Sequence, residues 1–248
     1  SWSKDVAGQS AEAPAPGPGE SPRRPVPGRS TETLFTEADL KRWLESMESA
    51  ALVSLEIETT SPDPMQAQLV GLAFCPAAGR AAYLPLAHNY AGAPAQLGVE
   101  PALAILKPWL ESETHAKVGR NAKYHEHVLA NHGIALRGIA HDTLLESYVL
   151  ESHMRHDLES LASRHLGAKT IGYDEVTGTG AQRIPFEQVD VAHAAAFAAE
   201  GADLGLQIHE ALLPRIQAEA GLARVYGSIE MPVREVLFQM ERNGVMLD

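Results

Sequence analysis

Apolar residues begin to recur at helical spacing after the first thirty-five residues. Thr36 and Asp39 have the spacing of an N-terminal cap. The apolar residues that follow at intervals of three and four are Leu40, Trp43, Leu44 and Met47. This pattern predicts that order begins near Thr36, with a first helix.

Strand-like segments come next. They are Ala51–Ile57, Gln68–Cys75 and Ala81–Leu86, and the last two are joined by the turn Pro76-Ala77-Ala78-Gly79. Short β-rich runs separated by such turns are typical of neighbouring antiparallel strands. We therefore expect an antiparallel meander of three strands.

From Val99 onward the pattern becomes helical, interrupted by one short strand around Ala116–Val118. The expected helices lie near Asn121–Asn131, Asp142–Leu150, Asp157–Leu166 and Val191–Ile216, and a last one runs toward Arg242, before the stop signal Asn243-Gly244. Three strands followed by strands that alternate with helices predict a mixed α/β fold.

The N-terminal segment has a different composition. Residues 1–30 hold six of the 16 prolines and four of the 20 glycines, and Val6 and Val26 are their only branched aliphatic residues. Such a segment buries too little apolar surface to offset the entropy of ordering. We expect residues 1–33 to form a disordered linker rich in proline, glycine and alanine, with another domain before it.

Composition and charge exclude several classes of protein. No apolar run approaches the roughly 20 residues that span a bilayer, so we expect no membrane partner. The single cysteine, Cys75, excludes a disulfide scaffold and a cysteine zinc cluster, which favours a reducing, cytoplasmic location. The net charge of −12, from 20 basic and 32 acidic residues, predicts that the chain alone binds DNA weakly if at all.

Two carboxylates share one face of the first predicted strand. Glu56 and Glu58 are two residues apart, so they point the same way, about 7 Å apart at the backbone. Such a pair can converge on a divalent metal ion. A bare pair of this kind is more often the solvated face of an edge strand.

Longer blocks decide between these interpretations. In chain order they are Glu56-Ile57-Glu58-Thr59, Leu69-Val70-Gly71-Leu72, Ala82-Tyr83-Leu84-Pro85-Leu86-Ala87-His88, Leu106-Lys107-Pro108, Val118-Gly119-Arg120-Asn121-Ala122-Lys123-Tyr124, His141-Asp142-Thr143-Leu144-Leu145-Glu146-Ser147-Tyr148 and Phe197-Ala198-Ala199-Glu200. From Leu34 to its end, the chain closely resembles the 3′→5′ proofreading exonuclease domain of bacterial family-A DNA polymerases, the DNA polymerase I type.

The resemblance implies a fold and a domain organisation. It implies a ribonuclease H-like fold of the DEDD exonuclease superfamily, with a mixed sheet flanked by helices, over residues 34–225. Residues 226–248 look like the truncated start of a polymerase domain, because they contain Ile229-Glu230-Met231-Pro232 and Glu241-Arg242-Asn243-Gly244-Val245. The implied partners are the polymerase and 5′-nuclease domains of one parent chain.

Active members of that family use four acidic residues to hold two metal ions, magnesium or manganese, and a tyrosine that orients the attacking water. At the matching positions this chain has Glu56 in place of an aspartate, the retained Glu58, His125 and Gly201 in place of two aspartates, and Phe197 in place of the tyrosine. Three of these five positions have lost their functional group.

Neighbouring acids are poorly placed to compensate for these losses. At 100° per residue, Glu200 is a quarter-turn from Gly201, Asp203 is almost opposite, and Glu126 is a quarter-turn from His125. We therefore expect an inactive, vestigial exonuclease-like domain that acts as a scaffold. Glu56 and Glu58 would bind metal weakly at best, and no cofactor would bind tightly. Gly201 also has a structural interpretation, as a close-packing position.

Two alternatives remain open. One is an atypical exonuclease that uses Glu56, Glu58 and His125 with manganese or zinc, since imidazole suits those metals better than magnesium. The other is a module that guides single-stranded DNA. By the resemblance, Asn121 lies near the scissile end and Tyr173 can stack on a base, although Tyr173 packing on a loop is about as plausible. The pair His153 and His156 lacks a third ligand nearby and indicates a solvated turn.

Overall fold

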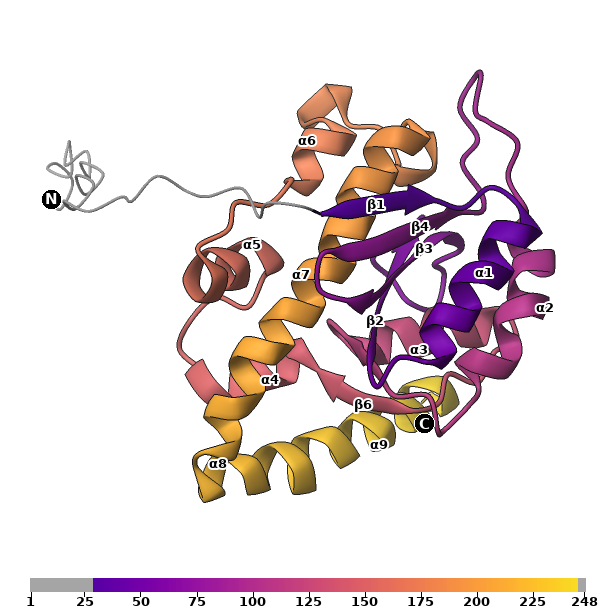
Figure 1. The fold of residues 1–248 in the computed structure, drawn as a ribbon. Coiled ribbons are helices and arrows are strands. Elements are labelled where there is room, and N and C mark those ends of the chain that lie inside the picture. The colour runs from indigo at the N-terminus through magenta and orange to yellow at the C-terminus, as the bar shows by residue number, and fades with distance from the viewer. Residues whose placement is uncertain (1–28, 245–248) are drawn as a thin grey trace, which may run out of the picture.

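The computed structural model describes residues 29–244, in which one sheet lies between helices on both faces (Figure 1). Residues 1–28, which hold most of the expected linker, lie outside the described residues. The strands are β1 (Ser30–Thr33), β2 (Val53–Thr59), β3 (Leu69–Ala77), β4 (Arg80–Pro85), β5 (Lys117–Gly119) and β6 (Ile139–Asp142), in the sheet order β1-β4-β3-β2-β5-β6.

The pairing makes the sheet mixed. β2 pairs antiparallel with β3 and β3 pairs antiparallel with β4, which confirms the expected meander. β1, β5 and β6 join in parallel, β1 on β4 and the other two beyond β2. The centre of the sheet is thus the β3 and β2 pair, and the acidic strand β2 is an interior strand rather than an edge.

The helices follow the sequence pattern closely. They are α1 (Glu37–Glu48), α2 (Val99–Leu110), α3 (Ala122–Asn131), α4 (Thr143–Glu151), α5 (Leu158–Leu161), α6 (Tyr173–Thr177), α7 (Val191–Gln217), α8 (Ala220–Val225) and α9 (Met231–Asn243), with the short turns η1 (Ala162–Leu166), η2 (Gly180–Gln182), η3 (Phe186–Gln188) and η4 (Tyr226–Glu230). The predicted cap is present, since the Thr36 side chain accepts a hydrogen bond from the Asp39 backbone N–H. None of the helices in the described range is both long and apolar enough to cross a bilayer.

Two short strands correct the sequence prediction. β1 lies inside the segment expected to be a linker, which ran to residue 33, and β6 was not expected. Both are four residues long, so periodicity carries little signal for them. Their order comes from pairing across the sheet: the Ser30 N–H donates to the Gly79 carbonyl at 2.8 Å, and the Leu34 N–H to the Tyr83 carbonyl at 2.8 Å.

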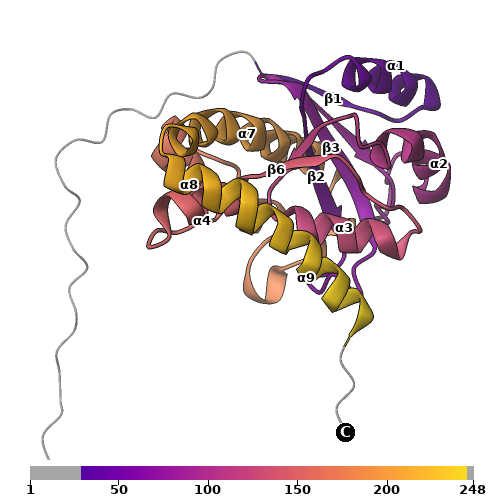
Figure 2. The same cartoon turned by 90° about the horizontal axis from the view of Figure 1, so that it is seen from below.

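The sheet separates two apolar cores. One face packs against α1, α2 and α3 through residues such as Leu55 and Trp43, and the other packs against α7 through residues such as Val70 and Ala198. Figure 2 shows α7 on one side of the strands and α1 and α2 on the other. Alternate residues of β2 therefore face different layers.

A close contact in the second core generates a stability prediction. Gly71 of β3 lies against the buried Tyr83, whose hydroxyl is 2.8 Å from His88 Nε2, and a Cβ at position 71 would overlap the tyrosine ring. Gly71→Ala is expected to lower the free energy of unfolding by about 1–3 kcal/mol, because Tyr83 must move to make room. Urea unfolding measures the change.

The matched control is Gly221→Ala in α8, where an added Cβ meets no atom within 4 Å. That variant is expected to be neutral or stabilised by up to about 1 kcal/mol, through helix propensity alone. Equal effects of the two substitutions would contradict the packing argument.

Candidate active site

The acidic face of β2 lies beneath helix α7. Leu55 and Ile57 of β2 belong to the core on the α1 side, so Ser54, Glu56 and Glu58 point to the other side. There, a Cβ added at Gly205 of α7 would lie 2.9 Å from Ser54 Oγ and 3.7 Å from Glu56 Oε1. The helix therefore approaches the polar side chains of the strand closely.

The two glycines of this helix face differ in what they permit. A Cβ at Gly205 would lie too close to the Ser54 hydroxyl, which would have to rotate away to make room. A Cβ at Gly201, one turn earlier, would lie 3.9 Å from both Glu56 Cγ and Leu158 Cδ2, which is an ordinary contact distance. Space for a side chain exists at Gly201, so packing does not explain the glycine there.

The predicted site residues line one cavity of about 550 Å³. These residues are Glu56, Glu58, Asn121, His125, Tyr173, Phe197 and Gly201. Arg120 and Arg183 also line the cavity, and sequence reasoning missed both. A lone arginine carries no motif, so only its position in the fold connects it to the site.

His125 lines the cavity beside the Glu56 carboxylate. It is 4% exposed, and its Nε2 lies 3.5 Å from Glu56 Oε2. On the other side the ring lies against β5, where a Cβ at Gly119 would be only 2.9 Å from His125 Nδ1. The imidazole is therefore held between the strand backbone and the first carboxylate.

Asn121 fixes the start of the helix that carries His125. It is the one non-glycine residue with positive φ among the described residues, at φ 63°, a conformation in which asparagine is enriched. The Asp142 carboxylate accepts hydrogen bonds from the Asn121 and Ala122 backbone N–H groups at 3.1 and 2.8 Å. The Asn121 side chain is thus presented to the cavity by a turn that Asp142 stabilises.

Glu58 lies in a poorly hydrated position. Burial of its carboxyl and the nearby Glu56 carboxylate raise the pKa of Glu58 to about 8, although the Arg120 guanidinium acts in the opposite direction. Within the cavity, Arg120 is a cation near this carboxyl. Its Nε is buried and has no hydrogen-bond partner in the part of the chain that the structure describes.

The acidic residues near Gly201 are held elsewhere. The Arg29 side chain donates to Glu200 Oε2 at 2.6 Å and to Asp203 Oδ2 at 2.7 Å. Glu200 also accepts from the Ile171 backbone N–H at 2.7 Å, and Asp203 accepts from the Gly79 N–H at 2.7 Å. Neither carboxylate lines the cavity.

Aromatic side chains form another wall. Tyr173, at the start of α6, is 46% exposed and stacks on Phe186 with ring centroids 6.1 Å apart. Its edge meets Phe197 at 6.0 Å, and the Arg183 guanidinium lies 6.0 Å from its ring centroid. The tyrosine thus contacts three side chains and still exposes nearly half of its surface at the cavity.

The side chains that line the cavity do not supply enough ligands for a pair of divalent ions. Among the cavity residues in the described part of the chain, Glu56 and Glu58 are the only carboxylates, and the third potential ligand is the His125 imidazole. No histidine, cysteine or acidic side chain in residues 29–244 offers a third ligand atom within 4.8 Å of both. Two metal ions need more oxygen ligands than this.

Two other places with titratable side chains are less suited to catalysis. A second cavity of about 550 Å³ lies between α3 and α9, but its Glu126 forms an ion pair with Arg234. His156 of the predicted turn bonds to Ser147 Oγ at 2.6 Å through its Nδ1, and His153 is exposed. The cavity at the end of β2 remains the candidate active site.

Comparison with known proteins places this geometry in a family. A family model described as 3′-5′ exonuclease matches residues 31–217. The chain is 44% identical to DNA polymerase I of Pseudomonas aeruginosa over all of its own length and 27% of that protein, and 38% identical to DNA polymerase I of Rhizobium leguminosarum over 87% of the chain and 23% of that protein. It thus spans about a quarter of the curated relatives it matches.

Solved structures show the same fold. The POL domain of Pol1 from M. smegmatis, in complex with DNA primer-template and dNTP, superposes with a TM-score of 0.66 at 23% identity, over 88% of this chain and 33% of that chain. Brucella melitensis NrnC with bound Mg²⁺ superposes with a TM-score of 0.57 at 18% identity, over 88% and 95% of the two chains. The sheet is the mixed, helix-flanked sheet of the ribonuclease H-like exonucleases.

The environment of Glu58 makes stability depend on pH. The pKa of Glu58 is about 8 in the folded chain against an ordinary value of 4.5, so the folded state resists ionisation that the unfolded state allows. The contribution of the neutral Glu58 carboxyl to the free energy of unfolding is therefore fully present below about pH 4.5 and is lost as the pH rises toward 8. Glu58→Gln, which stays neutral, is expected to be more stable than the parent at pH 8 by about 1–3 kcal/mol, and the difference should vanish near pH 4.5.

Urea unfolding of both proteins across this pH range provides the measurement. Glu48→Gln, at an exposed position at the end of α1, is the control and should leave the pH profile of the parent unchanged. A Glu58→Gln effect of the same size at every pH would contradict the burial of an ionisable carboxyl.

Proposed function

The chain belongs to the 3′–5′ exonuclease family of family-A DNA polymerases, and we propose that it is a member without nuclease activity, retained as a scaffold within a DNA polymerase I. The observation that carries this proposal is the pair of carboxylates left on the cavity. Glu56 and Glu58 face an imidazole at His125 and a bare helix backbone at Gly201.

Charge compensation supports the same proposal. A cluster of carboxylates that binds no metal is destabilised by mutual repulsion. Here Arg120 lies beside Glu58, and Arg29 neutralises Glu200 and Asp203. Arg29 thus neutralises the acidic residues next to Gly201 without a metal ion, whereas burial and the Glu56 carboxylate favour the neutral form of Glu58 by raising its pKa to about 8.

A scaffold role is consistent with the length of the relatives and with the complete apolar cores. The relatives are about four times as long as the match, so the proposed partners are the polymerase and 5′-nuclease domains of the same parent chain, in the cytoplasm. The hydrophobic cores on both faces of the sheet are complete in the described residues, whereas the ligand set is not.

A nuclease assay tests the proposal directly. Release of nucleotides from a 3′-labelled single-stranded oligonucleotide is measured with magnesium, manganese or zinc, for the parent and for Glu58→Ala. We expect equal, background-level release from both proteins, because the cavity lacks the ligands for two metal ions. Release by the parent that Glu58→Ala loses would establish the atypical enzyme that uses Glu56, Glu58 and His125.

A repaired variant is the positive control. It combines Glu56→Asp, His125→Asp, Phe197→Tyr and Gly201→Asp, and the open space at Gly201 leaves room for the new carboxylate beside Glu56. With magnesium we expect it to exceed the parent by about 10²-fold or more, the scale that a single catalytic group supplies. The matched version with His125→Asn and Gly201→Asn should stay at background.

A second role, guiding single-stranded DNA, is favoured by the cavity's two arginines and its exposed tyrosine. We expect weak binding nevertheless, with a Kd above about 10⁻⁴ M for a labelled oligothymidylate at ~0.15 M salt, because the net charge is −12. Tyr173→Ala is expected to change nothing in fluorescence anisotropy.

The control for that measurement is Tyr148→Ala, at a comparably exposed tyrosine outside the cavity. A guiding module would instead give binding that weakens with salt and falls about 5- to 100-fold in Tyr173→Ala alone, the effect of losing one stacked base.

A further inference from the structure

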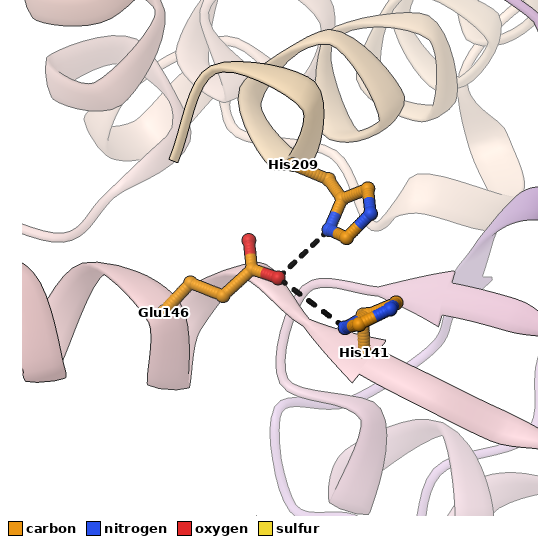
Figure 3. Close-up of side chains that lie close together, drawn as sticks. All are labelled: His141, Glu146 and His209. Atoms are coloured by element: carbon orange, nitrogen blue, oxygen red, sulfur yellow. Dashed lines mark hydrogen bonds and ion pairs between the residues drawn. The ribbon is translucent and has the colours of Figure 1, made fainter. Parts of the chain in front are cut away.

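A second group of metal-ligating side chains lies outside the candidate active site. His141 at the end of β6, Glu146 of α4 and His209 of α7 point toward one another (Figure 3). We name them the His–Glu–His cluster. None of the three lines the cavity that holds Glu56 and Glu58. His209 is eight residues after Gly201 on α7, about 12 Å along the helix axis.

The donor atoms of the cluster surround one point. Glu146 Oε1 lies 2.7 Å from His209 Nδ1 and 3.6 Å from His141 Nδ1, and the three ligand atoms are all within 4.8 Å of one another. The Tyr226 hydroxyl is a fourth potential ligand atom, 3.2 Å from Glu146 Oε1 and 3.2 Å from His141 Nδ1. Four side chains from four elements thus supply two nitrogens and two oxygens.

Hydrogen bonds among the described residues do not satisfy every polar atom of the cluster. Glu146 is fully buried, and its second oxygen, Oε2, has no hydrogen-bond partner among residues 29–244. The neighbouring Asp142 is 2% exposed, and within the same range its carboxylate accepts hydrogen bonds only from backbone N–H groups. Its own N–H donates to the Tyr226 hydroxyl at 3.2 Å. Within residues 29–244, no lysine or arginine forms an ion pair with either carboxylate. Buried carboxylates without a cation are costly, so the cluster is suited to a positive ion.

We propose that His141, Glu146 and His209 bind a zinc ion, with the Tyr226 hydroxyl or a water as the fourth ligand. Imidazole nitrogen with carboxylate oxygen is a ligand set that zinc prefers and magnesium does not. Zinc bonds of about 2.0–2.2 Å in a tetrahedron separate ligand atoms by roughly 3.3–3.5 Å, within the spread seen here. A small shift of the His209 ring away from Glu146 would complete the site.

The ion would hold together elements that are distant in sequence. It would join β6, α4 and α7 to η4, the turn that leads into α9. A cavity of about 300 Å³, lined by His141 and Tyr226, adjoins the cluster and gives an ion a route to it. This inference does not depend on whether the candidate active site cuts DNA.

Metal titration of the chelator-treated protein tests the assignment. We expect calorimetry with zinc chloride to show one ion per chain, and thermal unfolding to shift upward by about 5–10 °C when zinc is present at about 100 times its Kd. Cobalt(II) should give the visible absorption of a tetrahedral site with nitrogen and oxygen ligands, a readout that needs no variant.

Variants then locate the ion. His141→Gln and Glu146→Gln should weaken zinc binding by about tenfold or more and abolish the cobalt spectrum. The matched control His193→Gln, on the exposed start of the same helix α7, and the active-site variant Glu58→Gln should both bind as the parent does. Circular dichroism verifies that each variant is folded.

Three results would overturn the proposal. The first is the absence of stoichiometric zinc binding by the parent. The second is unchanged binding in folded His141→Gln and Glu146→Gln. The third is loss of binding in Glu58→Gln, which would place the ion in the candidate active site instead.

Discussion

The close approach of α7 to the polar face of β2 is the constraint on which the rest of the site depends. Gly205 lets the helix backbone lie against Ser54, and one turn away Gly201 lies over Glu56. The helix covers part of this polar face, and Glu56 and Glu58 remain partly exposed where they line the cavity. Neighbouring side chains therefore act strongly on their charge, as the raised pKa of Glu58 shows.

Side chains of residues 29–244 meet part of that constraint. Arg29 reaches from beside the first strand to two carboxylates of α7, and Arg120 lies beside Glu58. The His125 imidazole fills the wall beside Glu56. Within these residues no ion pair neutralises Glu58, and burial raises its pKa to about 8.

Much of this could be predicted from residues alone, and the omissions have physical causes. Long segments such as α7 and the three-stranded meander contain many residues that fit one hydrophobic period, so the sequence predicted them. The strands β1 and β6 have only four residues each, which is too few for a clear periodic pattern. They form because they pair with neighbouring strands of the sheet. The strand alternation gave Glu56 and Glu58 a common face, and the resemblance of the longer sequence blocks to a known family singled them out as candidate site residues. Arg120 was missed because a lone arginine belongs to no motif. The His–Glu–His cluster was missed because His209 lies 63 residues from Glu146 in sequence, and only the fold brings them together.

The ion pairs of Arg29 also have a consequence for the order of folding. Its partners Glu200 and Asp203 lie 171 and 174 residues further along the chain. Contacts at such separation close the longest loops, and they form late because the entropy of loop closure must be overcome first. β1 is synthesised long before α7, so these ion pairs cannot form until α7 has been made. An edge strand of the sheet is thus secured in part by a helix that is translated more than 150 residues after it.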